Sequence, residues 1–193
     1  MKTPSPQPSP AGGRGSVKPW MQTLRLELRE FTRADFDELL RLDSDPRVMK
    51  YINGGKPSSK KDIEAALGRV ARYYRSWYGL GVWHATRRDT GAFIGWYCLK
   101  YCPPTCDVEV GYRLLRQAWG QGFATEGATE LVRYGFDDLG LDKIIGVTHP
   151  GNRASQRVLM KAGLDDAGYA RRYYGRRLRL FVGHRDARQV SAA

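Results

Sequence analysis

Apolar residues recur with two different periods along the chain, and each period predicts one kind of secondary structure. A period of two, typical of a half-buried strand, is present at residues 24–28 and 108–114. Apolar runs at 82–86, 93–99 and 143–148, and two arginine-rich stretches at roughly 166–174 and 177–184, are also expected to be strands. Helical spacing predicts helices over 36–43, 59–77, 124–139 and 152–162, with a shorter one over 46–51. Strands flank helices throughout, which predicts an α/β domain.

Capping and turn residues mark the ends of several of these segments. Thr32 with Asp35 and Ser59 with Asp62 have the spacing of a capping box at a helix start. A turn at residues 89–91 joins the segments 82–86 and 93–99, which predicts a hairpin. In the strand at 108–114, Glu109 stands between two valines and is therefore expected on the face opposite to them.

Composition divides the chain into three parts. Residues 1–20 are rich in Pro, Gly and Ser, so we expect a disordered tail, then a single domain over 21–188 and a flexible C-terminus at 189–193. Met21 falls where the patterned sequence begins, and deletion of residues 1–20 is expected to leave the melting temperature unchanged. No apolar run approaches the length of a membrane span, and the N-terminus lacks the apolar block of a secretory signal. These features predict a cytoplasmic protein without membrane contact.

The chain is strongly basic, with 32 Lys and Arg residues against 20 Asp and Glu, a formal net charge of +12. This excess favours an anionic partner, such as nucleic acid, a membrane surface or a polyphosphate cofactor, although solvated surface charge also explains it. Contact with RNA on a ribosome and simple solvation are both open for the arginines of the C-terminal hairpin, namely Arg171, Arg172, Arg176, Arg177, Arg179, Arg185 and Arg188.

The three cysteines and one strand histidine predict no metal centre. Cys98, Cys102 and Cys106 are four residues apart, which is neither a disulfide framework nor the paired spacing of a zinc ribbon. We expect reduced thiols and no metal. His84 is a lone histidine in a strand and is expected to be structural.

The loop at residues 119–126 is the strongest local signal for a ligand. Gly120 and Gly122 lie between a predicted strand and a predicted helix, where the missing Cβ atoms and the free N–H groups of a helix start suit an anion such as phosphate. A tight turn without a ligand explains the glycines as well. Asn152 to Ser155 opens another helix one strand later, so both helix starts are expected at the same edge of the sheet.

Three motifs then carry a resemblance to a known family: Glu109-Val110-Gly111-Tyr112, the loop at 119–126, and Asn152-Arg153-Ala154-Ser155 followed by residues 158–163. In this order they resemble the GNAT superfamily of N-acetyltransferases, and within it the RimJ/RimL type that acetylates ribosomal-protein N-termini. The resemblance covers most of residues 22–184.

The resemblance implies a mixed, mostly antiparallel sheet of about seven strands with helices on both faces. The strands at 108–114 and 143–148 would splay apart, with acetyl-CoA between them, its pyrophosphate on the backbone N–H groups of the glycine loop and its pantetheine arm along the strand edge. The residues that the resemblance assigns to the cofactor are Tyr112, Arg113, Leu114, Trp119, Gly120, Gln121, Gly122, Phe123, Ala124, Thr125, Asn152 and Ser155.

The chemistry that the resemblance implies is direct attack of an amine on the thioester, without an acetyl-enzyme. Glu109, directly or through a water, is the candidate base, and the alternative for it is a solvent-facing strand carboxylate. Ser155 would protonate or hydrogen-bond the leaving thiolate, and a backbone N–H near Leu114 would polarise the carbonyl. The three cysteines match no nucleophile position.

The chain departs from the family pattern at two positions, and one alternative function remains open. Trp119 stands where the family often has Gln or Arg, so a side-chain contact to phosphate is in doubt there, and Leu164 replaces a usual aromatic residue. The resemblance implies that the acceptor amine, a protein N-terminus or a small molecule, binds in loops around 51–57 and 169–175. The alternative function is a basic RNA- or ribosome-binding module that retains the fold without turnover. The chain would be a monomer or a homodimer.

Overall fold

A computed structural model describes residues 19–185 and shows one mixed sheet in the order β1-β2-β3-β4-β5-β6-β8-β7. All neighbouring strands are antiparallel except β5 and β6, which are parallel. The strands are β1 (Met21–Gln22), β2 (Leu26–Glu30), β3 (Gly81–Arg87), β4 (Phe93–Tyr101), β5 (Val108–Leu114), β6 (Lys143–Thr148), β7 (Asp165–Ala170) and β8 (Leu178–His184). The predicted mixed, mostly antiparallel sheet is confirmed, with eight strands in the described residues, since the two-residue β1 adds to the expected seven.

Five α-helices and two short 3₁₀ helices surround the sheet in the described residues: η1 (Arg33–Asp35), α1 (Phe36–Asp43), α2 (Pro46–Asn53), α3 (Lys60–Ser76), η2 (Arg116–Ala118), α4 (Phe123–Asp137) and α5 (Arg153–Lys161). The capping box of Ser59 and Asp62 is present at the start of α3. That of Thr32 and Asp35 stands at η1 rather than at an α-helix. Trp77, the last residue of the helix expected over 59–77, lies just beyond the end of α3 and is 45% exposed.

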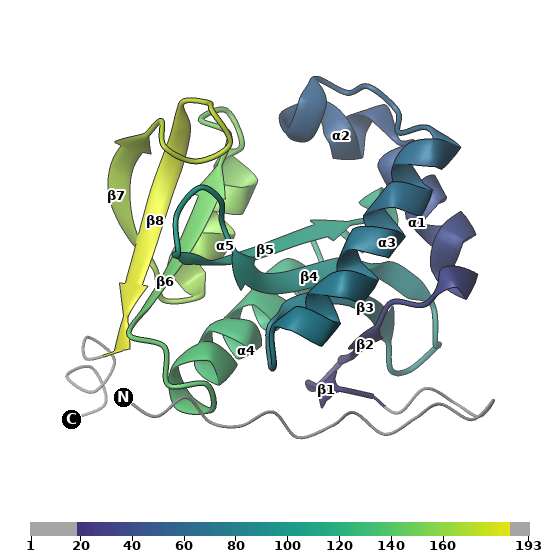
Figure 1. Ribbon diagram of the computed structural model, residues 1–193, viewed down its shortest axis with the longest axis horizontal. Coiled ribbons are helices and arrows are strands. Elements are labelled where there is room, and N and C mark those ends of the chain that lie inside the picture. Colours follow the sequence, from purple (N-terminus) through teal and green to yellow (C-terminus); the bar gives the residue numbers. More distant parts are fainter. Residues whose placement is uncertain (1–18, 186–193) are drawn as a thin grey trace.

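The helices cover both faces of the sheet, as predicted (Figure 1). On one face α4 packs against β4, β5 and β6, and α5 packs against β6, β7 and β8, over a large apolar core that includes Phe136, Leu159 and Tyr97. On the other face α1 and α3 cover a smaller core that includes Ile63. At Gly127 of α4 a Cβ atom would lie 2.3 Å from the ring of Tyr97, so the absence of a side chain there allows the close approach of helix and sheet.

The two parallel strands in the middle of the sheet separate soon after they begin. Register pairs join β5 and β6 only at Val108 with Ile144 and at Glu109 with Ile145, although β5 continues to Leu114 and β6 to Thr148. The predicted splay is therefore confirmed. It leaves backbone groups of both strands available for a partner other than the neighbouring strand. In Figure 1, β6, β7, β8 and α5 lie on one side of this divergence and β2, β3, β4 and α1 to α3 on the other.

The ends of the pattern differ from the expectations in three places. Most of the predicted tail lies outside the described residues, as do residues 189–193, but Trp20 packs in the fold, because its ring stacks on Trp83 and its N–H donates to the carbonyl of Leu28 at 2.8 Å. Leu24, expected in a buried strand face, is 84% exposed in the turn between β1 and β2. The strand expected over 166–174 ends at Ala170. None of the described helices is long and apolar enough to cross a bilayer.

Candidate active site

The glycine loop joins η2 to α4 at the far end of β5. Gly120 and Gly122 have φ angles of 74° and 82°, a left-handed backbone conformation that residues other than glycine rarely adopt. Gly122 is the N-cap residue of α4, and no side chain of the described residues caps this helix start. The first N–H groups of α4, on Phe123, Ala124 and Thr125, therefore have no partner within the helix.

Arg25, directly before β2, holds this loop in place together with Glu126 of α4. The Arg25 guanidinium lies 2.7 Å from the Glu126 carboxylate, donates to the carbonyl of Gln121 at 2.9 Å and lies 4.5 Å from the centre of the Phe123 ring. Glu126 also accepts hydrogen bonds from the Thr23 hydroxyl and the Arg25 backbone N–H. Burial alone would raise the pKa of Glu126, but these donors lower it below its ordinary value.

Trp119 turns its indole toward the strand rather than leaving it free. Its Nε1 donates to the carbonyl of Leu114 at 2.9 Å, while 48% of the residue stays exposed. It lines a hollow of about 630 Å³ between this loop and the junction of α1 and α2. The residues around this basic hollow are Arg41, Asp45, Arg47, Leu115, Arg116, Gln117 and Trp119.

The arginines of the basic hollow are poorly neutralised. Arg116 lies 3.9 Å from Asp45, the one carboxylate in the lining, and that carboxylate also accepts from the backbone N–H of Arg47. Three cations thus face one acid in a concave surface beside the glycine loop. Such an arrangement favours an anionic ligand.

On the other side of the splay, the first turn of α5 carries Asn152 and Ser155. The Asn152 side chain accepts from the Ser155 N–H at 3.2 Å, which makes Asn152 the N-cap that the sequence predicts. The Ser155 side chain lies near that of Tyr112 of β5, across the separated strands. Burial raises the pKa of Tyr112, and the neighbouring Ser155 side chain offsets part of that rise.

Glu109 is buried rather than solvent-facing. It lies at the last register pair before the strands separate, is 8% exposed, and points away from Val108 and Val110, as predicted. Its Oε2 accepts from Lys100 Nζ at 3.0 Å and from the Tyr174 hydroxyl at 2.5 Å. Lys100 also donates to the Tyr174 hydroxyl at 2.8 Å. The alternative of a solvated strand carboxylate is therefore wrong.

Besides Lys100 and Tyr174, the same face of the sheet as Glu109 carries the thiol of Cys98 and the guanidinium of Arg113, which is already paired with a carboxylate. A Cβ atom at Gly111 would lie 3.0 Å from Cys98 Sγ, so this thiol lies beside the same strand segment. Burial raises the pKa of Cys98 to about 12, which keeps it a neutral thiol. Arg113 turns to Asp43 of α1, at 2.6 Å, and lies 5.0 Å from the centre of the Trp96 ring. Its side chain is thus committed to α1, while its backbone remains on the edge of the splay.

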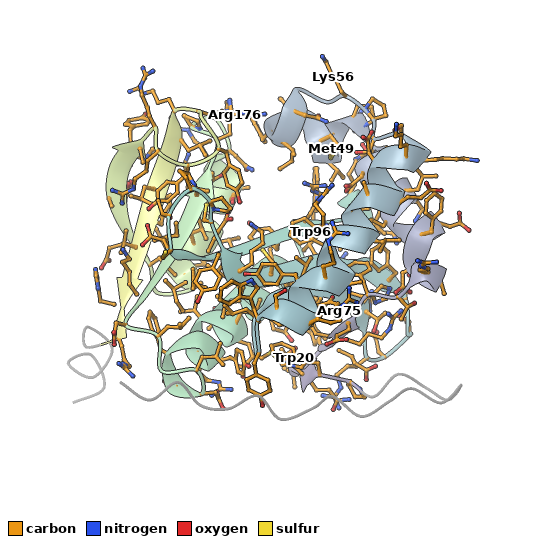
Figure 2. The ribbon with its side chains drawn as sticks, viewed as in Figure 1. Trp20, Met49, Lys56, Arg75, Trp96 and Arg176 are labelled. Carbon is orange, nitrogen blue, oxygen red and sulfur yellow. The ribbon has the colours of Figure 1, made fainter. Side chains whose placement is uncertain are left out.

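Helix α2 connects the two halves of the molecule above the splayed strands. Arg176 of the β7–β8 loop donates to the carbonyl of Ile52 at 2.6 Å, and Figure 2 shows Arg176 and the labelled Met49 of α2 on opposite sides of the space between these elements. The ring of Tyr51 lies 5.1 Å from that of His149, which precedes α5. The loops expected to meet the acceptor, around 51–57 and 169–175, therefore come together.

Three side chains in the described residues that could together ligate a metal ion already have hydrogen-bond partners. Asp35, Glu38 and His84 place three potential ligand atoms within 4.8 Å of one another. Asp35, however, accepts two bonds from Arg29 and one from the N–H of Thr32, and His84 Nε2 lies 2.6 Å from Glu38. An adjacent guanidinium opposes a cation, so these groups fit an internal hydrogen-bond network, in agreement with a structural His84. Cys98 and Cys102 are buried free thiols and Cys106 is an exposed one.

Comparison with known proteins identifies the family. The profile of the acetyltransferase (GNAT) domain matches residues 25–165, well over half of the chain. The chain belongs to the GNAT acetyltransferase family. The transacetylase FsC-acetyl coenzyme A-N(2)-transacetylase of Aspergillus fumigatus is 35% identical over 156 residues, which are 77% of this chain and 66% of that protein, just under two thirds of its length.

Solved structures confirm the GNAT fold. The acetyltransferase of Agrobacterium tumefaciens superposes with a TM-score of 0.75 at 23% identity, over 91% of this chain and 99% of that one. The RimL ribosomal-protein α-N-acetyltransferase in complex with coenzyme A gives 0.71 at 14% identity, over 86% and 97%. Identities this low show the fold alone. The enzyme class, an N-acetyltransferase, follows from the family.

Most of the residues that the sequence assigns to the cofactor lie on β5, in the glycine loop and at the start of α5, and the RNA-binding alternative gains no support. Five of the C-terminal arginines have partners within the described chain: Arg172 over Tyr173, Arg176 on Ile52, Arg177 and Arg179 over Tyr169, and Arg185 on Asp142. Arg188 lies outside the described residues.

Sequence reasoning missed Lys100, Tyr174, Arg25 and the arginines of the basic hollow. A signal existed only for Lys100, which stands directly opposite Glu109 in the pairing of β4 and β5. Its position could be derived once the register of that hairpin was known. Tyr174 comes from a loop 65 residues later in the chain, and no local pattern connects it with Glu109.

Proposed function

We propose that this GNAT acetyltransferase transfers the acetyl group of acetyl-CoA directly to a primary amine, with Glu109 accepting the amine proton. The observation that carries the proposal is the position of a buried carboxylate at the point where β5 and β6 separate. The residues beyond that point provide an open strand edge, and the loop at its end provides free helix N–H groups. These features suit the pantetheine arm and the phosphates of coenzyme A respectively.

Several residues would hold the cofactor. The N–H groups of Gln121, Gly122, Ala124 and Thr125 would bind the pyrophosphate, and the backbone of residues 112–114 would bind the arm. Asn152 would reach an amide of that arm in addition to its cap. We also assign the basic hollow to the cofactor-binding site, because its three arginines lie beside the same loop and suit the anionic groups of the cofactor. Bound there, acetyl-CoA supplies the activated acetyl thioester.

The chain's own groups then handle protons and charge. An α-amine has a pKa near 8, so a minority is already neutral at pH 7 and the base removes a proton as the new bond forms. Ser155, on the other side of β5 from Glu109 and near Tyr112, would donate a hydrogen bond to the leaving thiolate. No acetyl-enzyme is needed, because Cys98 is a buried neutral thiol and none of the cysteines takes the place of a nucleophile.

Two acceptor classes are consistent with the fold, and we favour a small-molecule amine. The fungal relative, whose name describes transfer of an acetyl group to N2 of FsC, is 35% identical, whereas RimL shares only 14%. The hydrogen bond from Arg176 to the carbonyl of Ile52 also ties the β7–β8 loop to α2 on the acceptor side. The RimJ/RimL-type acceptor, a ribosomal-protein N-terminus, is the second arm of the test.

The test is thiol release from acetyl-CoA with a panel of small amines, polyamines, amino-acid derivatives and N-terminal peptides, followed by mass spectrometry of the product. A small amine is expected to give the highest kcat/KM. With that acceptor, Glu109→Gln is expected to lower kcat by about 10²-fold or more and Ser155→Ala by a smaller factor. Failure of every acceptor, or wild-type kcat in both variants, would contradict the proposed chemistry.

A further inference from the structure

Lys100, Glu109 and Tyr174 form a closed network on the face of the sheet where the acceptor is expected. Each of the three polar groups is bonded to the other two: Lys100 to Glu109 at 3.0 Å, Tyr174 to Glu109 at 2.5 Å and Lys100 to Tyr174 at 2.8 Å. The Glu109 side chain is 10% exposed and that of Lys100 24%. A carboxylate and an ammonium are thus held together with little access to water.

Two separate parts of the chain converge to make this network. Lys100 is fixed by the sheet, since it is the direct cross-strand neighbour of Glu109 in the β4–β5 pairing. Tyr174 comes from the β7–β8 loop and has a φ angle of 53°, uncommon for a residue other than glycine. Arg176, two residues later, bonds to Ile52 of α2 and holds the same loop. The loop is therefore shaped to deliver the Tyr174 hydroxyl to the carboxylate.

We propose that Lys100 is a positioning residue for acetyl transfer, which keeps the Glu109 carboxylate ionised and fixed in orientation, and that the Tyr174 hydroxyl completes this arrangement. The inference rests on the proposed function, in which Glu109 accepts the proton of the acceptor amine. A buried carboxylate without a cation takes up a proton readily, because burial disfavours the charged form, and a protonated carboxyl is no base. Lys100 opposes that protonation at a distance of 3.0 Å.

Lys100 is the cation that faces Glu109 in the described residues. The other titratable groups around the network are Cys98 of β4, Cys102 just after it, Tyr174 of the β7–β8 loop and Tyr73 of α3, which are neutral near pH 7, while Arg113 of β5 is paired with Asp43. Burial by itself would lower the pKa of Lys100, but its acidic neighbours, among which the Glu109 carboxylate is the one charged near pH 7, raise it above its ordinary value. The side chain therefore stays an ammonium across the working pH range.

The experiment compares Lys100→Met with wild type in the full chain by two readouts. One is the pH profile of kcat/KM from pH 5 to 9 with the acceptor found in the panel. The other is a carboxyl ¹³C NMR titration without substrates, with the Glu109 signal assigned from Glu109→Gln. Both the acid limb of the rate profile and the NMR midpoint are expected to move upward by about 1 pH unit or more in Lys100→Met, because an adjacent opposite charge shifts a carboxyl by that amount.

Two controls make the shift specific. Lys100→Arg keeps the cation and is expected to restore the wild-type acid limb, at least in part. Lys143→Met removes another lysine that pairs with a carboxylate, Asp107, on the neighbouring strand and is expected to leave the acid limb in place. Tyr174→Phe removes one hydroxyl from the network and is expected to move the acid limb and the NMR midpoint upward by less than Lys100→Met does. It also tests the network if Lys100→Met does not fold.

The possible failures are distinguishable. An NMR midpoint that does not move in Lys100→Met, or in Tyr174→Phe if the former does not fold, overturns the inference. So does an acid limb that coincides with wild type while Glu109→Gln is inactive, and that result leaves the role of Glu109 standing. Wild-type activity of Glu109→Gln overturns the proposed base itself, whatever the titration shows.

Discussion

The indole of Trp20 stacks on that of Trp83, with ring centroids 3.9 Å apart and an angle of 10° between the planes. Tyr134 of α4 meets the Trp20 ring edge-on at 4.9 Å. The residue before β1 thus covers the edge of the larger core, where Trp83 is 2% exposed.

Removal of this ring is expected to destabilise the domain. Trp20→Ala should lower the free energy of unfolding by about 1–2 kcal/mol, from lost apolar burial and aromatic stacking, measured by urea unfolding at constant pH. A chain that starts at Met21 should show the same loss relative to one that starts at Trp20. Equal stability of those two chains would restore the original expectation that the domain begins at residue 21.

The Arg25–Glu126 pair should make the stability of the glycine loop depend on pH. The pKa of Glu126 is lowered in the folded chain, so its stabilisation is present above the unfolded value near 4.3 and is lost as the pH falls through the lower folded value. Glu126→Gln is expected to cost about 1–2 kcal/mol at pH 7. The difference from wild type should shrink below about pH 4, as measured by denaturant midpoints. A difference that stays constant from pH 7 to pH 3 would contradict this role.

Gly120 offers a test of the phosphate-binding loop with a matched control. Gly120 and Gly168 both have positive φ angles, of 74° and 82°, and a Cβ atom at either would meet no other atom within 4 Å. Replacement by Ala should cost each variant about 1–2 kcal/mol of stability through backbone strain. Only Gly120→Ala is expected to raise the KM for acetyl-CoA, because its Cβ enters the space proposed for the phosphates. Equal KM values in the two variants would remove the loop from the cofactor site.

The basic hollow predicts a salt-dependent affinity for the cofactor. Arg41→Glu reverses one of its charges and is expected to raise the KM for acetyl-CoA about 5- to 10-fold at low ionic strength and less at 0.5 M salt. Arg69→Glu makes the same charge change on α3, away from the hollow, and should have little effect. An increase in the KM of the acceptor alone would instead assign the hollow to an anionic group of the acceptor.

Local patterns predicted most of the fold because their causes are local. The start of α3 follows from Ser59 and Asp62, because the side chain of each accepts a hydrogen bond from the backbone N–H of the other. The β3–β4 hairpin follows from the short turn between two apolar runs. The strand predicted to include Leu24 and the helix predicted to include Trp77 were each drawn too long. Each residue lies one or two positions beyond its strand or helix, where the apolar pattern continues but the backbone has already turned.

The amino-acid sequence alone determined the fold class, the order of elements, the glycine loop and the alternation that turns Glu109 away from the valines. These features depend on neighbours within a few residues. Tertiary structure alone decided that Glu109 is buried and paired. Lys100 reaches it through strand register, and Tyr174 reaches it from a loop that packs against α2. The protonation and access of a carboxylate depend on the charges and the burial that other elements bring to it. A single strand cannot specify either.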